Sequence, residues 1–173
     1  MYQSKNATIM EIPQKPLLNY DEVLALLPHA DPMVMIDKLW SSKGDNTVSG
    51  FLVKESNIFC KNKVLQEPAL IENVAQTAAI RVGYQALLAA QANNEQPKPP
   101  FGYIVAVKNC RIHELPKVND ELKTSISVKA LVMNVYFIEG TVFKEGKAIL
   151  ECEMRIYQED HVKSQKSSVK NQQ

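Results

Sequence analysis

The chain has 173 residues, of which 45% are hydrophobic and 23% charged, and its formal net charge is +1 at pH 7. These values are ordinary for a globular protein of one domain, and the length suffices for a buried core. The near-zero charge excludes general nucleic-acid binding, which normally requires a strong basic excess. The sequence predicts no membrane span and no signal peptide, because it has no run of about 18 apolar residues and its N-terminus is polar. We therefore expect a cytoplasmic protein.

The first half of the chain predicts a short helix followed by a hairpin. We expect a flexible arm over residues 1–16, a helix over 20–27 and a strand over 33–40. A turn over 43–46, a returning strand over 47–54 and an irregular connection over 55–66 follow. Polar residues and prolines make the arm a loosely attached segment. Asn19 can serve as the N-cap of the helix, and Pro28 ends it.

The second half predicts one long helix followed by four strands. The helix is expected from Pro68 to Gln91, and a proline in the first turn costs no intrahelical hydrogen bond. The strands are expected over residues 103–113, 121–131, 134–144 and 148–158, and a disordered polar tail over 159–173. Small and apolar residues cover most of the helix, which indicates burial nearly all round. A curled antiparallel sheet around one central helix accommodates this pattern, so residues 17–158 predict a single α+β domain.

Glu72 stands on a face of the long helix that is otherwise made of small residues. Its helical neighbours at three and four positions include Ala69, Ala75 and Gln76, and Ala79 follows on the same face seven positions away. A buried acid is costly unless it is paired or protonated, so we interpret Glu72 as retained for chemistry. The alternative is a structural carboxylate that is satisfied by neighbouring backbone or by a partner chain.

The cysteines and histidines show no metal-site spacing, so we predict no metal. Cys60, Cys110 and Cys152 are far apart, and the histidines form no H-x-x-x-H pair. Cys110 and Cys152 fall in predicted strands, where they are expected to pack as small hydrophobic residues. The chain also lacks a P-loop and a GxGxxG motif.

Three segments carry a resemblance to a known family. Residues 26–38 begin Leu-Leu-Pro-His, residues 70–79 read Leu-Ile-Glu-Asn-Val-Ala-Gln-Thr-Ala-Ala, and residues 103–120 lead to a proline and an Asn-Asp turn. In this order they resemble the hotdog-fold 3-hydroxyacyl-(acyl carrier protein) dehydratases. The resemblance implies a hotdog fold and dehydration of 3-hydroxyacyl thioesters to trans-2-enoyl thioesters in fatty-acid or polyene-type biosynthesis. It also implies a substrate carried on phosphopantetheine of an acyl carrier protein or coenzyme A, no other cofactor, and a homodimer or higher oligomer.

In this family a helix carboxylate protonates the departing hydroxyl, and a histidine in a His-Phe-Pro-Gly segment removes the C2 proton. Glu72 matches the carboxylate, but Ile58 or a neighbour stands where the histidine is expected. The aryl-polyene-type branch is similar in this respect, since it keeps the early Pro-His and the helix glutamate. We therefore predict His29 as the base, which requires its imidazole to lie within one hydrogen bond or one water of Glu72. The alternative is that His29 caps backbone carbonyls.

Further residues are assigned to substrate binding. Ala75, Ala79 and Gly83 leave room for an acyl chain along the helix. Gln76 either bonds the acid or satisfies its amide in the core, and Asn57 and Cys60 lie in the segment that replaces the family's histidine loop. A basic group is expected to receive an acidic carrier protein and its phosphate, or to form a solvated face: Lys61, Lys63, Lys108 and Arg111.

Two other functions stay open on the sequence. Hotdog thioesterases can use a helix glutamate without a histidine, and Glu72 with Gln76 would suit such hydrolysis. Loss of the usual histidine and glycines would also suit a non-catalytic acyl-binding subunit that pairs with an active homologue.

Overall fold

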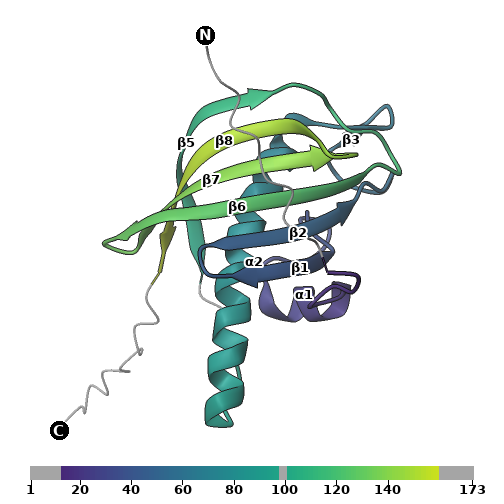
Figure 1. Cartoon of the computed structure of the whole chain (residues 1–173). Coiled ribbons are helices and arrows are strands. Elements are labelled where there is room, and N and C mark those ends of the chain that lie inside the picture. The colour runs from purple at the N-terminus through teal and green to yellow at the C-terminus, as the bar shows by residue number, and fades with distance from the viewer. Residues whose placement is uncertain (1–12, 98–100, 160–173) are drawn as a thin grey trace, which may run out of the picture.

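A curled antiparallel sheet wraps around the first half of a long helix (Figure 1). This is a computed structural model, and it describes residues 13–97 and 101–159. The six strands of the sheet run in the order β1-β2-β6-β7-β8-β5. They are β1 (Lys38–Lys43), β2 (Asn46–Leu52), β5 (Gly102–Ile112), β6 (Glu121–Val132), β7 (Val135–Lys144) and β8 (Lys147–Gln158). The helices are α1 (Tyr20–Leu26) and α2 (Glu67–Asn93), which confirms the predicted α+β class and the order of the two helices and the six strands of the main sheet.

The strand that the sequence predicts from residue 33 begins only at Lys38. Met35 does not pair with a neighbouring strand: its backbone N–H donates to Gln76 Oε1 over 2.7 Å, and its carbonyl accepts from Asn73 Nδ2 over 2.6 Å. Side chains of α2 thus take the hydrogen bonds that a strand partner would otherwise make. The segment before β1 is thereby held directly against the helix that carries Glu72.

The connection predicted as irregular contains a small hairpin. Its strands are β3 (Cys60–Lys61) and β4 (Val64–Leu65), and the turn residues Asn62 and Lys63 have φ of 52° and 63°. The ends of the predicted arm and tail, residues 1–12 and 160–173, lie outside the described residues. No helix in the described ranges is long and apolar enough to cross a membrane.

The main core lies between the first half of α2 and the concave face of the sheet. Leu70 and Val74 of α2 are fully buried there, against Val142 of β7 and Leu150 of β8. Gly140 of β7 permits this close approach, because a Cβ at that position would lie 2.4 Å from Cγ1 of Val74. The close distance between α2 and the sheet therefore depends on a glycine of a central strand.

The second half of α2 projects beyond the sheet (Figure 1), where Leu88 is 48% exposed. The expectation of a helix buried nearly all round is thus wrong for this half, because the strands do not reach it. Gly83 marks the change. A Cβ there would lie 2.6 Å from the carbonyl oxygen of Leu26, so Gly83 lets α1 pack against α2 and does not leave room for an acyl chain.

Candidate active site

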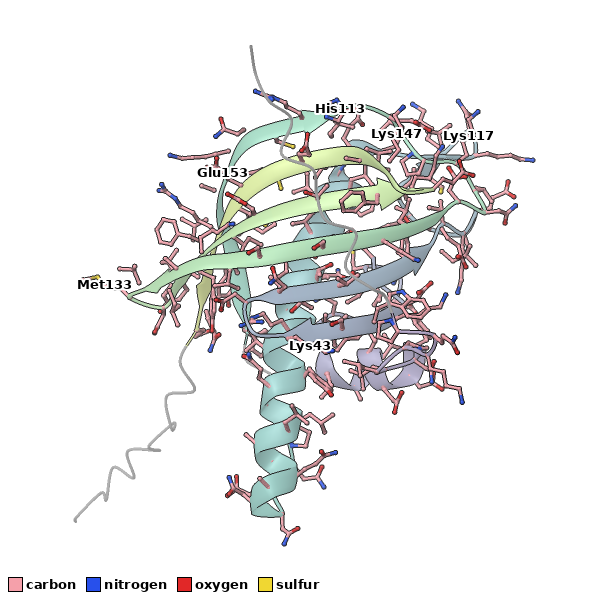
Figure 2. All side chains as sticks on the ribbon, in the orientation of Figure 1. Lys43, His113, Lys117, Met133, Lys147 and Glu153 are labelled. Atoms are coloured by element: carbon pink, nitrogen blue, oxygen red, sulfur yellow. The ribbon has the colours of Figure 1, made fainter. Side chains whose placement is uncertain are left out.

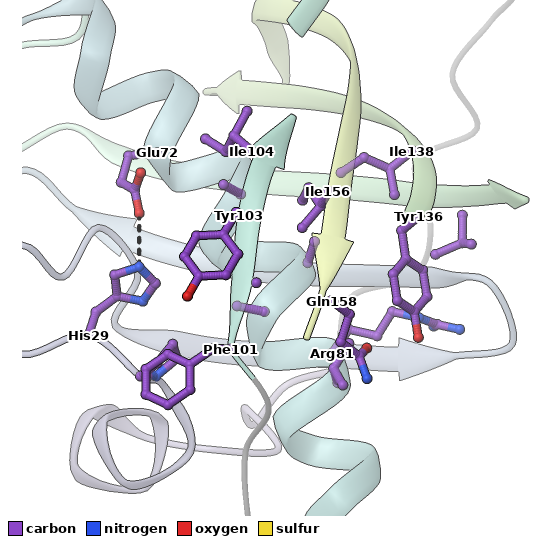
Figure 3. Close-up of a pocket in the computed structure, with 17 residues that line it drawn as sticks. His29, Glu72, Arg81, Phe101, Tyr103, Ile104, Tyr136, Ile138, Ile156 and Gln158 are labelled. Atoms are coloured by element: carbon purple, nitrogen blue, oxygen red, sulfur yellow. Dashed lines mark ion pairs between the residues drawn. The ribbon is translucent and has the colours of Figure 1, made fainter. Parts of the chain in front are cut away.

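A pocket of about 340 Å³ lies between α2 and the concave face of the sheet (Figure 3). Four of the residues predicted from the sequence line it: His29, Glu72, Ala75 and Ala79. Its remaining walls are largely apolar, with Val82 of α2 facing side chains of β5, β7 and β8 such as Ile104, Ile138 and Ile156. The small side chains of Ala75 and Ala79 line the helix side of the pocket, so an extended apolar chain has room beside Glu72.

The structure brings His29 and Glu72 together. Nε2 of the imidazole lies 3.3 Å from Oε1 of the carboxyl group (Figure 3), which is the proximity that the predicted pair requires. The side chains are 30% and 21% exposed, so Glu72 is a half-buried acid that faces a pocket rather than a fully buried one. Both residues come from the same chain.

Gln76 lies behind Glu72 and makes three hydrogen bonds. Its amide nitrogen donates to Glu72 Oε1 over 2.9 Å and to the carbonyl of Met33 over 2.7 Å, while its amide oxygen accepts the backbone N–H of Met35. Because Gln76 is fully buried and does not line the pocket, its assignment to substrate binding does not fit the geometry. It both bonds the acid and satisfies its amide in the core.

The loop that carries His29 is anchored on two sides. On one side the Tyr20 hydroxyl donates to the Asp31 carboxylate, at 2.7 and 2.8 Å from its two oxygens. On the other side the carbonyl of Met33 is bound by Gln76. Within the described residues, His29 caps no backbone carbonyl. The two anchors of the loop therefore fix the position of His29, and its imidazole ring faces Glu72 (Figure 3).

The Tyr20–Asp31 contact predicts an unusual titration. The hydrogen bond to the Asp31 carboxylate, followed by burial, raises the pKa of Tyr20 to about 12. Because this pKa lies above the ordinary value of 10.0, the contact contributes its full stability below about pH 10 and loses it as the pH rises through 12. Ultraviolet titration should show one tyrosine that ionises near pH 12, and Asp31→Asn should bring it back toward 10.0. An unchanged titration curve in Asp31→Asn would contradict the contact.

Asn57 and Cys60 lie outside this pocket. The Asn57 side chain accepts the backbone N–H of Phe59 over 2.9 Å and contacts the Met35 sulfur, and the Cys60 thiol donates to the carbonyl of Lys54 over 3.2 Å. Burial raises the pKa of the Cys60 thiol, which disfavours a reactive thiolate. Their local hydrogen bonds thus turn both side chains toward their own loop.

The two other cysteines differ from each other. Cys152 is buried in the core, as predicted, but Cys110 is exposed. Cys110 lies on β5, which is an edge strand of the sheet, and the sequence pattern of a strand does not show whether both of its faces are covered.

Polar residues that sequence reasoning did not single out line the far part of the pocket: Arg81, Tyr136 and Gln158. Arg81 is buried, donates to the carbonyl of Gly44 over 2.6 Å, and lies 3.7 Å from the Asp45 carboxylate. It ties α2 to the β1–β2 turn. A lone arginine within an otherwise apolar stretch of helix is the sequence signal that could have found it.

Comparisons with known proteins point to a family of dehydratases. The model of the ApeP-like family, described as ApeP dehydratase, matches residues 21–167. The 3-hydroxyacyl-(acyl-carrier-protein) dehydratase FabZ of Burkholderia mallei is 25% identical over 145 residues, which cover 79% of this chain and 90% of that relative.

Solved structures share the fold. The dehydratase heterocomplex ApeI:P from Xenorhabdus doucetiae matches with a TM-score of 0.70 and 16% identity, over 86% of this chain and 94% of the matched chain. A sigma28-regulated virulence protein from Campylobacter jejuni matches with a TM-score of 0.57 and 13% identity, over 82% and 90%. The hotdog fold implied by the sequence resemblance is thereby confirmed.

Proposed function

The chain belongs to the ApeP-like dehydratase family, and on that premise we propose that it converts 3-hydroxyacyl thioesters to trans-2-enoyl thioesters in fatty-acid or polyene biosynthesis. The observation that carries the proposal is the 3.3 Å contact between His29 and Glu72 at the wall of an apolar pocket. A carboxyl group beside an acyl-sized pocket is the arrangement that proton transfer on a thioester substrate needs.

Glu72 is the proton donor to the departing hydroxyl in this proposal. Elimination of water also needs a group that removes the proton at C2 of the substrate. The prediction that His29 is this base requires a ring nitrogen that carries a lone pair and can reach the substrate. The proposed elimination uses only proton transfers, so it needs no cofactor beyond the phosphopantetheine that carries the substrate.

We propose an acyl carrier protein as the donor of the substrate. Lys61, Lys63, Lys108 and Arg111 are all exposed, so their charges are available to an acidic partner and to the phosphate of phosphopantetheine. Coenzyme A carries the same arm and is the alternative donor.

We further propose that the protein acts as a dimer that pairs through β5. This edge strand exposes Tyr103, Ile104 and Val105, which are 57%, 41% and 58% exposed, beside the pocket residue Phe101. The opposite edge strand, β1, is partly covered, because Leu39 pairs with Leu18. An uncovered apolar edge is a ready surface for pairing with another chain.

A turnover assay tests the proposed function. Incubated with 3-hydroxyacyl carrier protein or 3-hydroxyacyl coenzyme A of several chain lengths, the protein should form a product lighter by one water, as measured by mass spectrometry. A saturated acyl thioester should release no free thiol. Thiol release without loss of water would instead support a thioesterase, and neither product at any chain length would leave acyl binding as the function.

A further inference from the structure

We propose that Glu72 alone transfers the protons of this reaction, through its Oε2, and that His29 and Gln76 are positioning residues that hold its Oε1. The inference deepens the proposed function and rests on it. It replaces the prediction that His29 is the base, and three features of the site carry it.

The first feature is the buried nitrogen of His29. Nδ1 lies buried, and no described residue is placed to hydrogen-bond with it. If Nε2 were to act as a base, the ring would need a proton on Nδ1 before the step and would carry protons on both nitrogens after it. Either form would bury an N–H without an acceptor, which is costly. Because Nδ1 is buried within the folded chain, it is not open to a substrate in the pocket.

The favoured form of His29 is therefore the tautomer with its proton on Nε2. In this form Nδ1 holds a lone pair, and the Nε2–H lies beside Glu72 Oε1 at 3.3 Å between heavy atoms. The imidazole then presents a donor to the carboxyl group and has no accessible lone pair with which to remove a proton.

The second feature is the fixed orientation of the Gln76 amide. A backbone N–H can only donate, so the contact with Met35 assigns the amide oxygen of Gln76 to that side. Its amide nitrogen must then face Met33 and Glu72, where it donates to Oε1 over 2.9 Å. The Gln76 amide thus donates to the same oxygen of Glu72 that lies 3.3 Å from Nε2 of His29.

The third feature is the other oxygen of Glu72. Oε2 accepts no hydrogen bond from any residue in the described ranges, although Glu72 lines the pocket and is 21% exposed at its side chain. The hydrogen bond from Gln76 and the contact with His29 hold Oε1 in place and so orient the carboxyl group. The oxygen that remains free is the one that can meet the substrate.

The reaction balances with this single group. As a carboxylate, Glu72 takes the C2 proton on Oε2, and the electron pair of the C2–H bond passes into the thioester enolate. The enolate then forms the C2–C3 double bond as the C3–O bond breaks, and Oε2 returns the same proton to the departing oxygen. Water leaves, and Glu72 is again a carboxylate.

Substitutions at His29 separate a base from a positioning donor. Glutamine cannot act as a base, but its amide can donate a hydrogen bond to Glu72, whereas alanine can do neither. We expect His29→Gln to keep kcat for enoyl formation within about 10-fold of the unchanged protein, and His29→Ala to lose roughly 100-fold. His113→Gln is the matched control, because His113 is exposed just after the end of β5 (Figure 2), and kcat should not change.

A folded His29→Gln variant that is as inactive as His29→Ala would overturn the proposal, because activity would then require a basic side chain at position 29 and not merely a hydrogen-bond donor. Full activity in His29→Ala would also overturn it, because no donor at that position would be needed. Circular dichroism and melting temperatures identify variants that fail to fold.

Nitrogen-15 chemical shifts of labelled histidine give a readout that does not need turnover. The His29 signals, identified by their loss in His29→Gln, should show a protonated Nε2 and an unprotonated Nδ1. A protonated Nδ1 would contradict the proposal. If the unchanged protein forms no enoyl product, the proposed function fails, whereas the tautomer measurement still reports on the proton arrangement.

Discussion

Replacement of Glu72 by glutamine is expected to lower enoyl thioester formation by about 1,000-fold or more, within the upper range of general acid–base effects. Glutamine has nearly the same shape but can neither release nor accept a proton under these conditions. Because Glu72 handles both proton transfers in our proposal, this loss should exceed that of His29→Ala. The measurement is kcat for loss of water from a 3-hydroxyacyl carrier protein, followed by mass spectrometry.

The control for this substitution lies on the same helix. Glu67 is exposed in the first turn of α2, so Glu67→Gln changes the same chemical group away from the pocket and should leave kcat unchanged. The stability of Glu72→Gln should change little, since its side chain is half-buried and still able to hydrogen-bond. A folded Glu72→Gln variant that retains a tenth or more of the activity would exclude Glu72 as the proton-transfer group.

Replacement of Gly140 by alanine is expected to destabilise the fold by about 1–3 kcal/mol, as overpacked cores do. The added Cβ would lie 2.4 Å from Cγ1 of Val74, which is fully buried in the core. Neither β7, a central strand, nor α2 can move away without disturbing the sheet or the pocket. Urea unfolding followed by circular dichroism measures the change in free energy.

Val74→Ala offers a matched second substitution, since it removes the methyl groups that the new Cβ would meet. Alone it should cost about 2 kcal/mol by leaving a cavity. The double variant should be more stable than the sum of the two effects by roughly 1 kcal/mol or more, because each change relieves the other. The side chain of Thr141 points to the other face of β7. The effects of Thr141→Ala and Val74→Ala on the free energy of unfolding should therefore be additive. Additivity in the Gly140 pair would show that the close approach is not what limits the packing.

The hydrophobic patterns of the strands and helices predicted the fold well. The strands of the second half begin and end within two residues of their predicted bounds, because each alternates or is apolar between clear turn residues. The segment before β1 was predicted incorrectly, because Met35 has the sequence of a strand but bonds to Asn73 and Gln76 of α2. A sequence pattern reports which side chains are buried and does not report which partner takes the backbone hydrogen bonds.

The candidate site was predictable in part. Glu72 stood out because an acid on an alanine-lined helix face needs an explanation, and Leu-Pro-His drew attention to His29 through a family resemblance. Asn57 and Cys60 were assigned to the same pocket because they replace the family's histidine loop. In the structure their own hydrogen bonds direct them into that loop, away from the pocket.

The sequence by itself determined the α+β class, the central helix and the acid on it, since all three follow from local periodicity and from the cost of burying a charge. Only the tertiary structure decided what surrounds that acid. Glu72, His29 and Gln76 meet through contacts between α2 and the segment that precedes β1. The hydrogen bonds of Gln76 with the segment before β1 and the contact of His29 with Glu72 join atoms that lie far apart along the chain. In our proposal they decide which oxygen of Glu72 is held and which one carries the proton.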